Sequence, residues 1–149
     1  MDLFEQVSAD IKSAMLSKDK DRLEALRAIK KEFLEAKTAK GANGALSEDT
    51  AVKILQKMIK QRKDSAEIYQ TQNRPELAEK ERIEAKHIEG YLPSQLSPEE
   101  LEAIIKELIN QVGATSAKEM GKVMGIASKQ LAGKAEGRAI SEMVKKILN

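Results

Sequence analysis

The chain has no cysteine and only one histidine, His87, among its 149 residues. No disulfide, thiolate metal site or cysteine nucleophile can therefore form. Glu84 and His87 make a single Glu-x-x-His pair, whereas a di-metal centre in a helix bundle needs two such pairs and two further glutamates. We expect no bound metal, and we expect His87 to pack against its neighbours or to cap a helix.

Aromatic residues make up 3% of the chain, and no segment alternates polar and apolar residues with period two. Strand signals are thus nearly absent. No apolar run approaches the roughly 18 residues that span a bilayer. The first residues, MDLFEQVSAD, lack the basic start of a secretory signal. We expect an all-α protein in the cytoplasm, with no membrane association.

Signatures of catalysis and of cofactor binding are also missing. The sequence has no P-loop, no dinucleotide fingerprint and no Ser/His/Asp order. The 24 acidic residues are mostly interleaved with lysines at helical spacing, as on a solvated helix face. We therefore expect no catalytic residue and no cofactor.

Apolar residues recur instead with the period of a helix. The pattern predicts a bundle of about four longer helices in residues 1–92 and a small domain of three shorter helices in residues 93–149. The boundary is the stretch GYLPSQLSPEEL, because Pro93 ends a helix and Ser97 with Glu100 forms a capping-box signature. Ser116 with Glu119 repeats that signature for the next helix.

One segment in the N-terminal part is strongly basic. Residues 52–63 hold five basic side chains and no acid. Lys53, Lys57 and Lys60 recur at i, i+4 and i+7, beside the apolar stripe of a helix. Such a row suits contacts with phosphate. The alternative is a solvated face whose charge is balanced by acids on a neighbouring helix.

The C-terminal part combines glycines with basic residues. Four of the eight glycines lie in residues 120–140, and Gly121 and Gly125 interrupt a helical pattern there. A glycine inside a helix costs roughly 1 kcal/mol relative to alanine. The missing side chain lets another backbone come close, either a packed helix or a sugar-phosphate chain. The surrounding basic residues are Lys118, Lys122, Lys129, Lys134 and Arg138.

Five motifs, in order, resemble the YqeY family and cover nearly the whole chain. They are DRLEALRAIKKE (21–32), KQRKDSAEIY (60–69), ERIEAKHIEGYLPSQLS (81–97), MGKVMG (120–125) and GKAEGRAI (133–140). The part after Leu92 is also similar to the C-terminal tail of GatB, the B subunit of the glutamyl/aspartyl-tRNA amidotransferase. That tail implies contact with the outer corner of tRNA. The resemblance also carries the label of a carbon–nitrogen ligase with glutamine as amido donor.

Two functions follow as expectations. The first is a tRNA-binding accessory protein without autonomous transamidation, because the chain lacks the catalytic cradle of the B subunit and a glutaminase. Its RNA-contacting residues would be Lys53, Lys57, Lys60, Lys118, Gly121, Lys122, Gly125, Lys129, Gly133, Lys134, Gly137 and Arg138. The second is a protein–protein adaptor that docks on an amidotransferase or an aminoacyl-tRNA synthetase without touching RNA.

Overall fold

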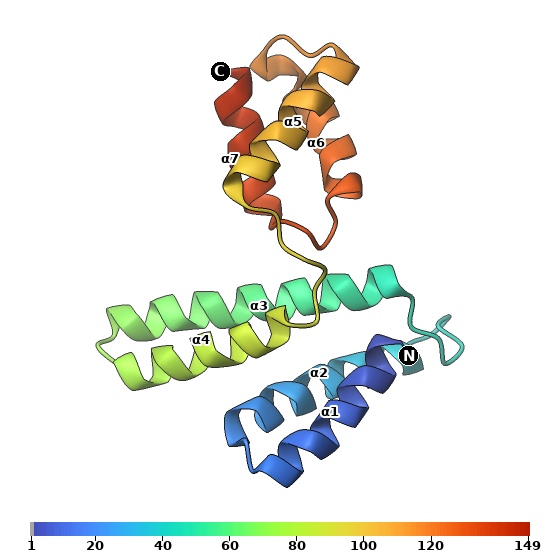
Figure 1. The fold of residues 1–149 in the computed structure, drawn as a ribbon, viewed down its shortest axis with the longest axis vertical. Helices are drawn as coiled ribbons and strands as arrows, with labels where there is room; N and C mark the ends of the chain where they lie inside the picture. The colour runs from blue at the N-terminus through green and yellow to red at the C-terminus, as the bar shows by residue number, and fades with distance from the viewer. Residues whose placement is uncertain (1) are drawn as a thin grey trace. The chain divides into compact units, whose positions relative to one another are not determined.

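The computed structural model describes residues 2–149. Figure 1 shows that the regular structure in this range is entirely helical, which confirms the all-α prediction. The residues form two compact units, one up to Leu92 and the other Pro93–Asn149. That these units are separate domains, each able to fold alone, stays a prediction.

The N-terminal unit consists of two helical hairpins. Helix α1 pairs with α2, and α3 pairs with α4 (Figure 1). The bounds are Leu3–Ser17 for α1, Lys20–Thr38 for α2, Glu48–Thr71 for α3 and Pro75–Glu89 for α4. Side chains cap three of the four helices. Asp2, Asp19 and Ser47 accept hydrogen bonds from backbone N–H groups three residues ahead, at 2.8, 3.3 and 3.2 Å.

The core of this unit is built from the apolar stripes of all four helices. Its largest fully buried side chains are Leu26, Ile29, Phe33, Leu55 and Ile88. Leu34 lies beside this core but is 43% exposed. Its neighbour Phe33 is fully buried, and a helix turns about 100° per residue, so Leu34 falls outside the buried stripe.

The C-terminal unit is a three-helix cluster. Helices α5 (Pro98–Val112), α6 (Met120–Gln130) and α7 (Gly137–Leu148) pack on one another around a single apolar core. The predicted capping box is present at α5, since Ser97 Oγ accepts from the Glu100 N–H at 3.1 Å and Glu100 Oε1 accepts from the Ser97 N–H at 3.2 Å. Gly113 ends α5 in the left-handed conformation, with φ 76°.

The second predicted capping box is wrong. Ser116 precedes a short 3-10 turn, η1 (Ala117–Glu119), and its side chain makes no capping bond. Glu119 Oε1 instead accepts from the N–H and the hydroxyl of Thr115, at 3.3 and 3.4 Å. Thr115 offers the carboxylate two donors one residue earlier than the signature expects, so α6 begins without a side-chain cap.

No helix in residues 2–149 combines the length and the apolar character needed to cross a membrane.

Candidate nucleic-acid interface

Helix α6 presents its two glycines to open space. Gly121 and Gly125 are exposed, and a Cβ atom added at either position would meet no heavy atom within 4 Å. The apolar side of α6 faces the core through Val123 and Ala127, which are fully buried. Within the C-terminal unit, no helix packs against either glycine. The structure thus leaves room for another backbone at both positions.

Lysines accompany the glycines on the exposed part of this segment. Lys118, Lys122 and Lys129 are all exposed, and α6 contains no acidic residue. Within the part of the chain that the structure describes, none of the three forms an ion pair. Lys122 and Lys129 are seven residues apart and thus lie on one side of the helix. The segment combines open backbone with positive charge that no neighbouring acid neutralises.

The turn between α6 and α7 alternates buried and exposed residues. Leu131, Gly133 and Ala135 are buried, whereas Lys134 is exposed between two of them. Gly133 adopts the left-handed conformation with φ 79°, which explains a glycine there without any ligand. Gly133 is thus buried, whereas the other predicted contact residues near it in the sequence are exposed. Gly137 begins α7 and is exposed.

Arg138 is the one predicted contact residue of this unit with an acidic partner. Its Nε lies 3.3 Å from Glu142 Oε1, and the two side chains are 86% and 71% exposed. An exposed pair at i, i+4 contributes at most a few tenths of a kcal/mol. Arg138 can therefore exchange this partner for a phosphate at little cost.

Gln95 is a residue that the sequence analysis passed over. Its side-chain Nε2 donates to the carbonyl oxygen of Gly133 at 2.7 Å and to that of Pro93 at 2.8 Å. The neighbouring Leu96 N–H donates to the Lys134 carbonyl at 2.9 Å. The segment that precedes α5 is thereby joined to the turn that precedes α7. Gln95 lies inside the motif YLPSQLS. The motif marked this stretch as notable, but from the sequence it indicated only a helix boundary.

The basic segment of α3 divides into two parts. Arg62 and Lys63 are paired with α4, through Arg62 Nε to Glu84 Oε2 at 3.2 Å and Lys63 Nζ to Glu89 Oε1 at 3.1 Å. The three predicted contact residues are exposed and form no ion pair with another described residue: Lys53, Lys57 and Lys60. Acids on a neighbouring helix therefore balance the charges of Arg62 and Lys63 but not the charges of these three lysines.

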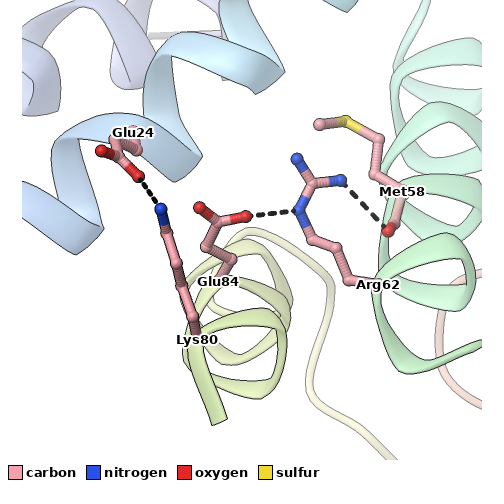
Figure 2. A network of polar contacts seen from close by, with 5 residues as sticks. All are labelled: Glu24, Met58, Arg62, Lys80 and Glu84. Carbon is pink, nitrogen blue, oxygen red and sulfur yellow. Dashed lines mark hydrogen bonds and ion pairs between the residues drawn. The ribbon is translucent and has the colours of Figure 1, made fainter. Parts of the chain in front are cut away.

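The paired part of α3 belongs to a polar network that joins three helices. Figure 2 shows Glu84 pointing toward Arg62, whose Nη1 also donates to the Met58 carbonyl at 3.4 Å. In the same view Lys80 of α4 reaches Glu24 of α2, with 3.1 Å between Nζ and Oε2. The hydrogen bond to Glu24 raises the pKa of Lys80. These contacts link α4 to α3 and to α2.

Glu81 lies close to this network, beside Glu84. Burial raises the pKa of Glu81, and the nearby charge of Glu84 raises it further. Glu84 itself is engaged by Arg62, so it does not form a ligand pair with His87. Among the described residues no group of three or more His, Cys, Asp or Glu side chains converges as metal ligands would.

His87 lines a small polar pocket of about 220 Å³ in the N-terminal unit, together with Gln6, Asp10, Arg22 and Tyr91. The Tyr91 hydroxyl donates to Asp10 Oδ2 at 2.6 Å. Arg22 Nη2 lies 4.0 Å from Asp10 Oδ1. Burial, followed by the hydrogen bond to Asp10, raises the pKa of Tyr91. The pocket is thus partly closed by its own internal contacts.

Comparison with known proteins supplies the family. A family model described as Yqey-like protein matches residues 4–148. Three relatives are each named "Altered inheritance of mitochondria protein 41, mitochondrial". The one from Pyrenophora tritici-repentis is 30% identical, over 96% of this chain and 79% of its own length. Those from Clavispora lusitaniae and Vanderwaltozyma polyspora are 33% and 37% identical, over 77% and 69% of this chain and 67% and 56% of theirs.

These relatives correct one expectation. All three carry the word mitochondrial in their names, so the expectation of a cytoplasmic location is wrong. It was based on composition and on the absence of a secretory signal. Neither feature distinguishes a cytoplasmic helical protein from one inside an organelle, because both work in water and need the same charged surface.

Proposed function

Since the chain belongs to the Yqey-like protein family, we propose that it is a tRNA-binding accessory protein. The contact surface is the exposed part of the C-terminal unit, which we call the glycine–lysine surface. It consists of Lys118, Gly121, Lys122, Gly125, Lys129, Lys134, Gly137 and Arg138.

One observation carries this proposal. The α6 glycines have no heavy atom within 4 Å of an added Cβ, and unpaired lysines stand beside them. A sugar-phosphate chain can approach open glycines more closely than it could approach side chains. Each lysine then acts as a point charge on a phosphate. Backbone contacts of this kind position a protein on RNA without reading its sequence.

The kind of RNA follows from what the surface lacks. Phe, Tyr and Trp are absent from residues 93–149, so no aromatic platform for stacked bases exists there. Proteins that hold single strands depend on such platforms. Recognition of folded RNA depends instead on shape, phosphates and 2′-hydroxyls. A tRNA contacted at its outer corner meets these conditions, and the similarity to the B-subunit tail supports it.

The proposed role is to hold RNA and not to transfer an amide. The likeness to the amidotransferase is confined to its tail, so the carbon–nitrogen ligase label describes the larger enzyme. We expect no conversion of Glu-tRNA(Gln) by this protein alone.

The test is binding of purified tRNA to the full chain, followed in a gel at several salt concentrations. A shift that weakens steeply with salt supports the proposal, because phosphate contacts release counterions. Lys122→Ala and Lys129→Ala should each weaken the shift. Lys12→Ala and Lys86→Ala are matched controls, since both lysines are exposed and without ion pairs in the described part of the chain.

An adaptor that docks on an amidotransferase or an aminoacyl-tRNA synthetase is the second candidate. It is favoured by apolar side chains that the N-terminal unit leaves in solvent, chiefly Met15 and Leu16 at the end of α1, which are 53% and 86% exposed. Absence of any tRNA shift, together with capture of such an enzyme that Leu16→Ser abolishes, would favour the adaptor.

A further inference from the structure

The turn before α7 is held by the segment before α5, although 38 residues separate Gln95 from Gly133 in the sequence. Both amide protons of a glutamine side chain can donate. In Gln95 the side-chain nitrogen donates to two carbonyl oxygens, those of Pro93 and Gly133. The first bond fixes the side chain to its own segment, and the second fixes the turn to that segment.

Lys134 follows directly, and its backbone is fully engaged. Its N–H donates to the Leu131 carbonyl at 2.9 Å, and its carbonyl accepts from the Leu96 N–H at 2.9 Å. The residues on either side, Gly133 and Ala135, are buried. The Lys134 side chain itself is exposed, and it forms no ion pair with another described residue.

We propose that Gln95 is a positioning residue that holds Lys134 ready for contact with an RNA phosphate. This inference rests on the tRNA-binding function proposed above and deepens it. A lysine side chain loses much of its freedom when it binds a phosphate. A backbone that is already fixed leaves less freedom to lose, so the contact is stronger. Gln95 itself does not touch the RNA.

A merely structural role would give a different result in a double-mutant cycle. The cycle compares wild type, Gln95→Ala, Lys134→Ala and the double variant in the full chain, with affinity for purified tRNA as the readout. If Gln95 acts through Lys134, the double variant binds no more weakly than Lys134→Ala alone. If Gln95 only stabilises the unit, the two losses of affinity add.

The dependence of affinity on salt is a second readout. Lys134→Ala should reduce the slope of log affinity against log salt by about one ion. Gln95→Ala removes no charge, yet it should reduce the slope as well, by up to the same amount. Gln95→Met, which keeps the length of the side chain but has no donor, should behave like Gln95→Ala. A slope unchanged in both Gln95 variants would overturn the proposal.

Control variants distinguish a failure of the positioning role from misfolding and from a failure of the proposed tRNA binding. Gln111→Ala removes an exposed side-chain amide of α5 that bonds only Glu107 among the described residues, at 3.4 Å, and it should change neither readout. Circular dichroism at the assay temperature must show native helix content for each variant, and Gln95→Met replaces Gln95→Ala in the cycle if the latter does not. If Lys122→Ala and Lys129→Ala weaken binding but Lys134→Ala does not, the positioning role is wrong and the proposed function stands. If none of the three weakens binding, the proposed function itself fails.

Discussion

The Tyr91 hydroxyl donates a hydrogen bond to Asp10 Oδ2 at 2.6 Å and so ties the segment after α4 to α1, 81 positions earlier in the chain. Tyr91→Phe removes the donor and leaves a half-buried carboxylate with one partner fewer. We expect the free energy of unfolding to fall by about 1–2 kcal/mol. Urea unfolding measures the change, and Tyr69→Phe, which breaks no hydrogen bond within the described residues, is the control.

The same bond gives a dependence on pH. The pKa of Tyr91 is raised in the folded protein by burial and by Asp10. A raised pKa means that the stabilisation is present below the unfolded pKa of about 10 and is lost as the pH rises above it. The stability difference between wild type and Tyr91→Phe should therefore be constant from pH 7 to 9 and shrink above pH 10. A difference that grows in alkali would contradict this assignment.

The pair of Arg62 and Glu84 supports another prediction. The side chains are only 17% and 13% exposed, so removal of one partner leaves a poorly hydrated charge. Arg62→Met should destabilise the protein by about 1–3 kcal/mol in thermal or urea unfolding. Adding Glu84→Gln should restore part of this loss, because the unpaired charge is then gone. Two additive losses would mean that the residues do not act as a pair.

Glu81 lies in the same network but opposes folding at neutral pH. Its pKa is raised, which means that the folded protein disfavours its charged form. Its stability contribution is most favourable below the unfolded pKa of about 4.3 and declines as the pH rises through the higher folded pKa. Glu81→Gln should therefore stabilise the protein at pH 7 by less than about 1 kcal/mol, with no gain at pH 3. Glu79→Gln, on the exposed side of α4, serves for comparison in the same unfolding series.

A substitution at Gly125 separates an effect on folding stability from an effect on RNA binding. It lies inside α6 with open space around it, so Gly125→Ala meets no neighbour and gains helix propensity. The free energy of unfolding should rise by up to roughly 1 kcal/mol. The affinity for tRNA should fall, because the methyl group keeps the RNA backbone at a distance. Loss of stability in this variant would show that the glycine serves packing after all.

Features governed by neighbouring residues were predictable from the sequence. The capping box of Ser97 and Glu100, for example, depends on a few adjacent residues. Where two local choices competed, prediction failed, as when Glu119 bonded Thr115 instead of Ser116. Amphipathic periodicity was enough to assign the helices and most of their buried faces.

Features governed by distant residues were not predictable. Gly133 is buried and Gln95 holds it, but nothing near either residue in the sequence indicates the other. Likewise the sequence did not indicate whether a helix packs against the α6 glycines, and only the structure shows the open space around them. The segment 52–63 shows the same limit, because only the position of α4 reveals which of its cations are paired.

The central claim is that the glycine–lysine surface holds folded RNA through its phosphates. The most direct measurement is the slope of log affinity for tRNA against log salt, for the wild type and for the variant Lys118→Ala/Lys122→Ala/Lys129→Ala. The account predicts a shallower slope for the variant, by about one ion for each lysine removed. It also predicts an unchanged slope for Lys12→Ala/Lys86→Ala. Equal slopes and affinities for the wild type and the three-lysine variant would contradict it.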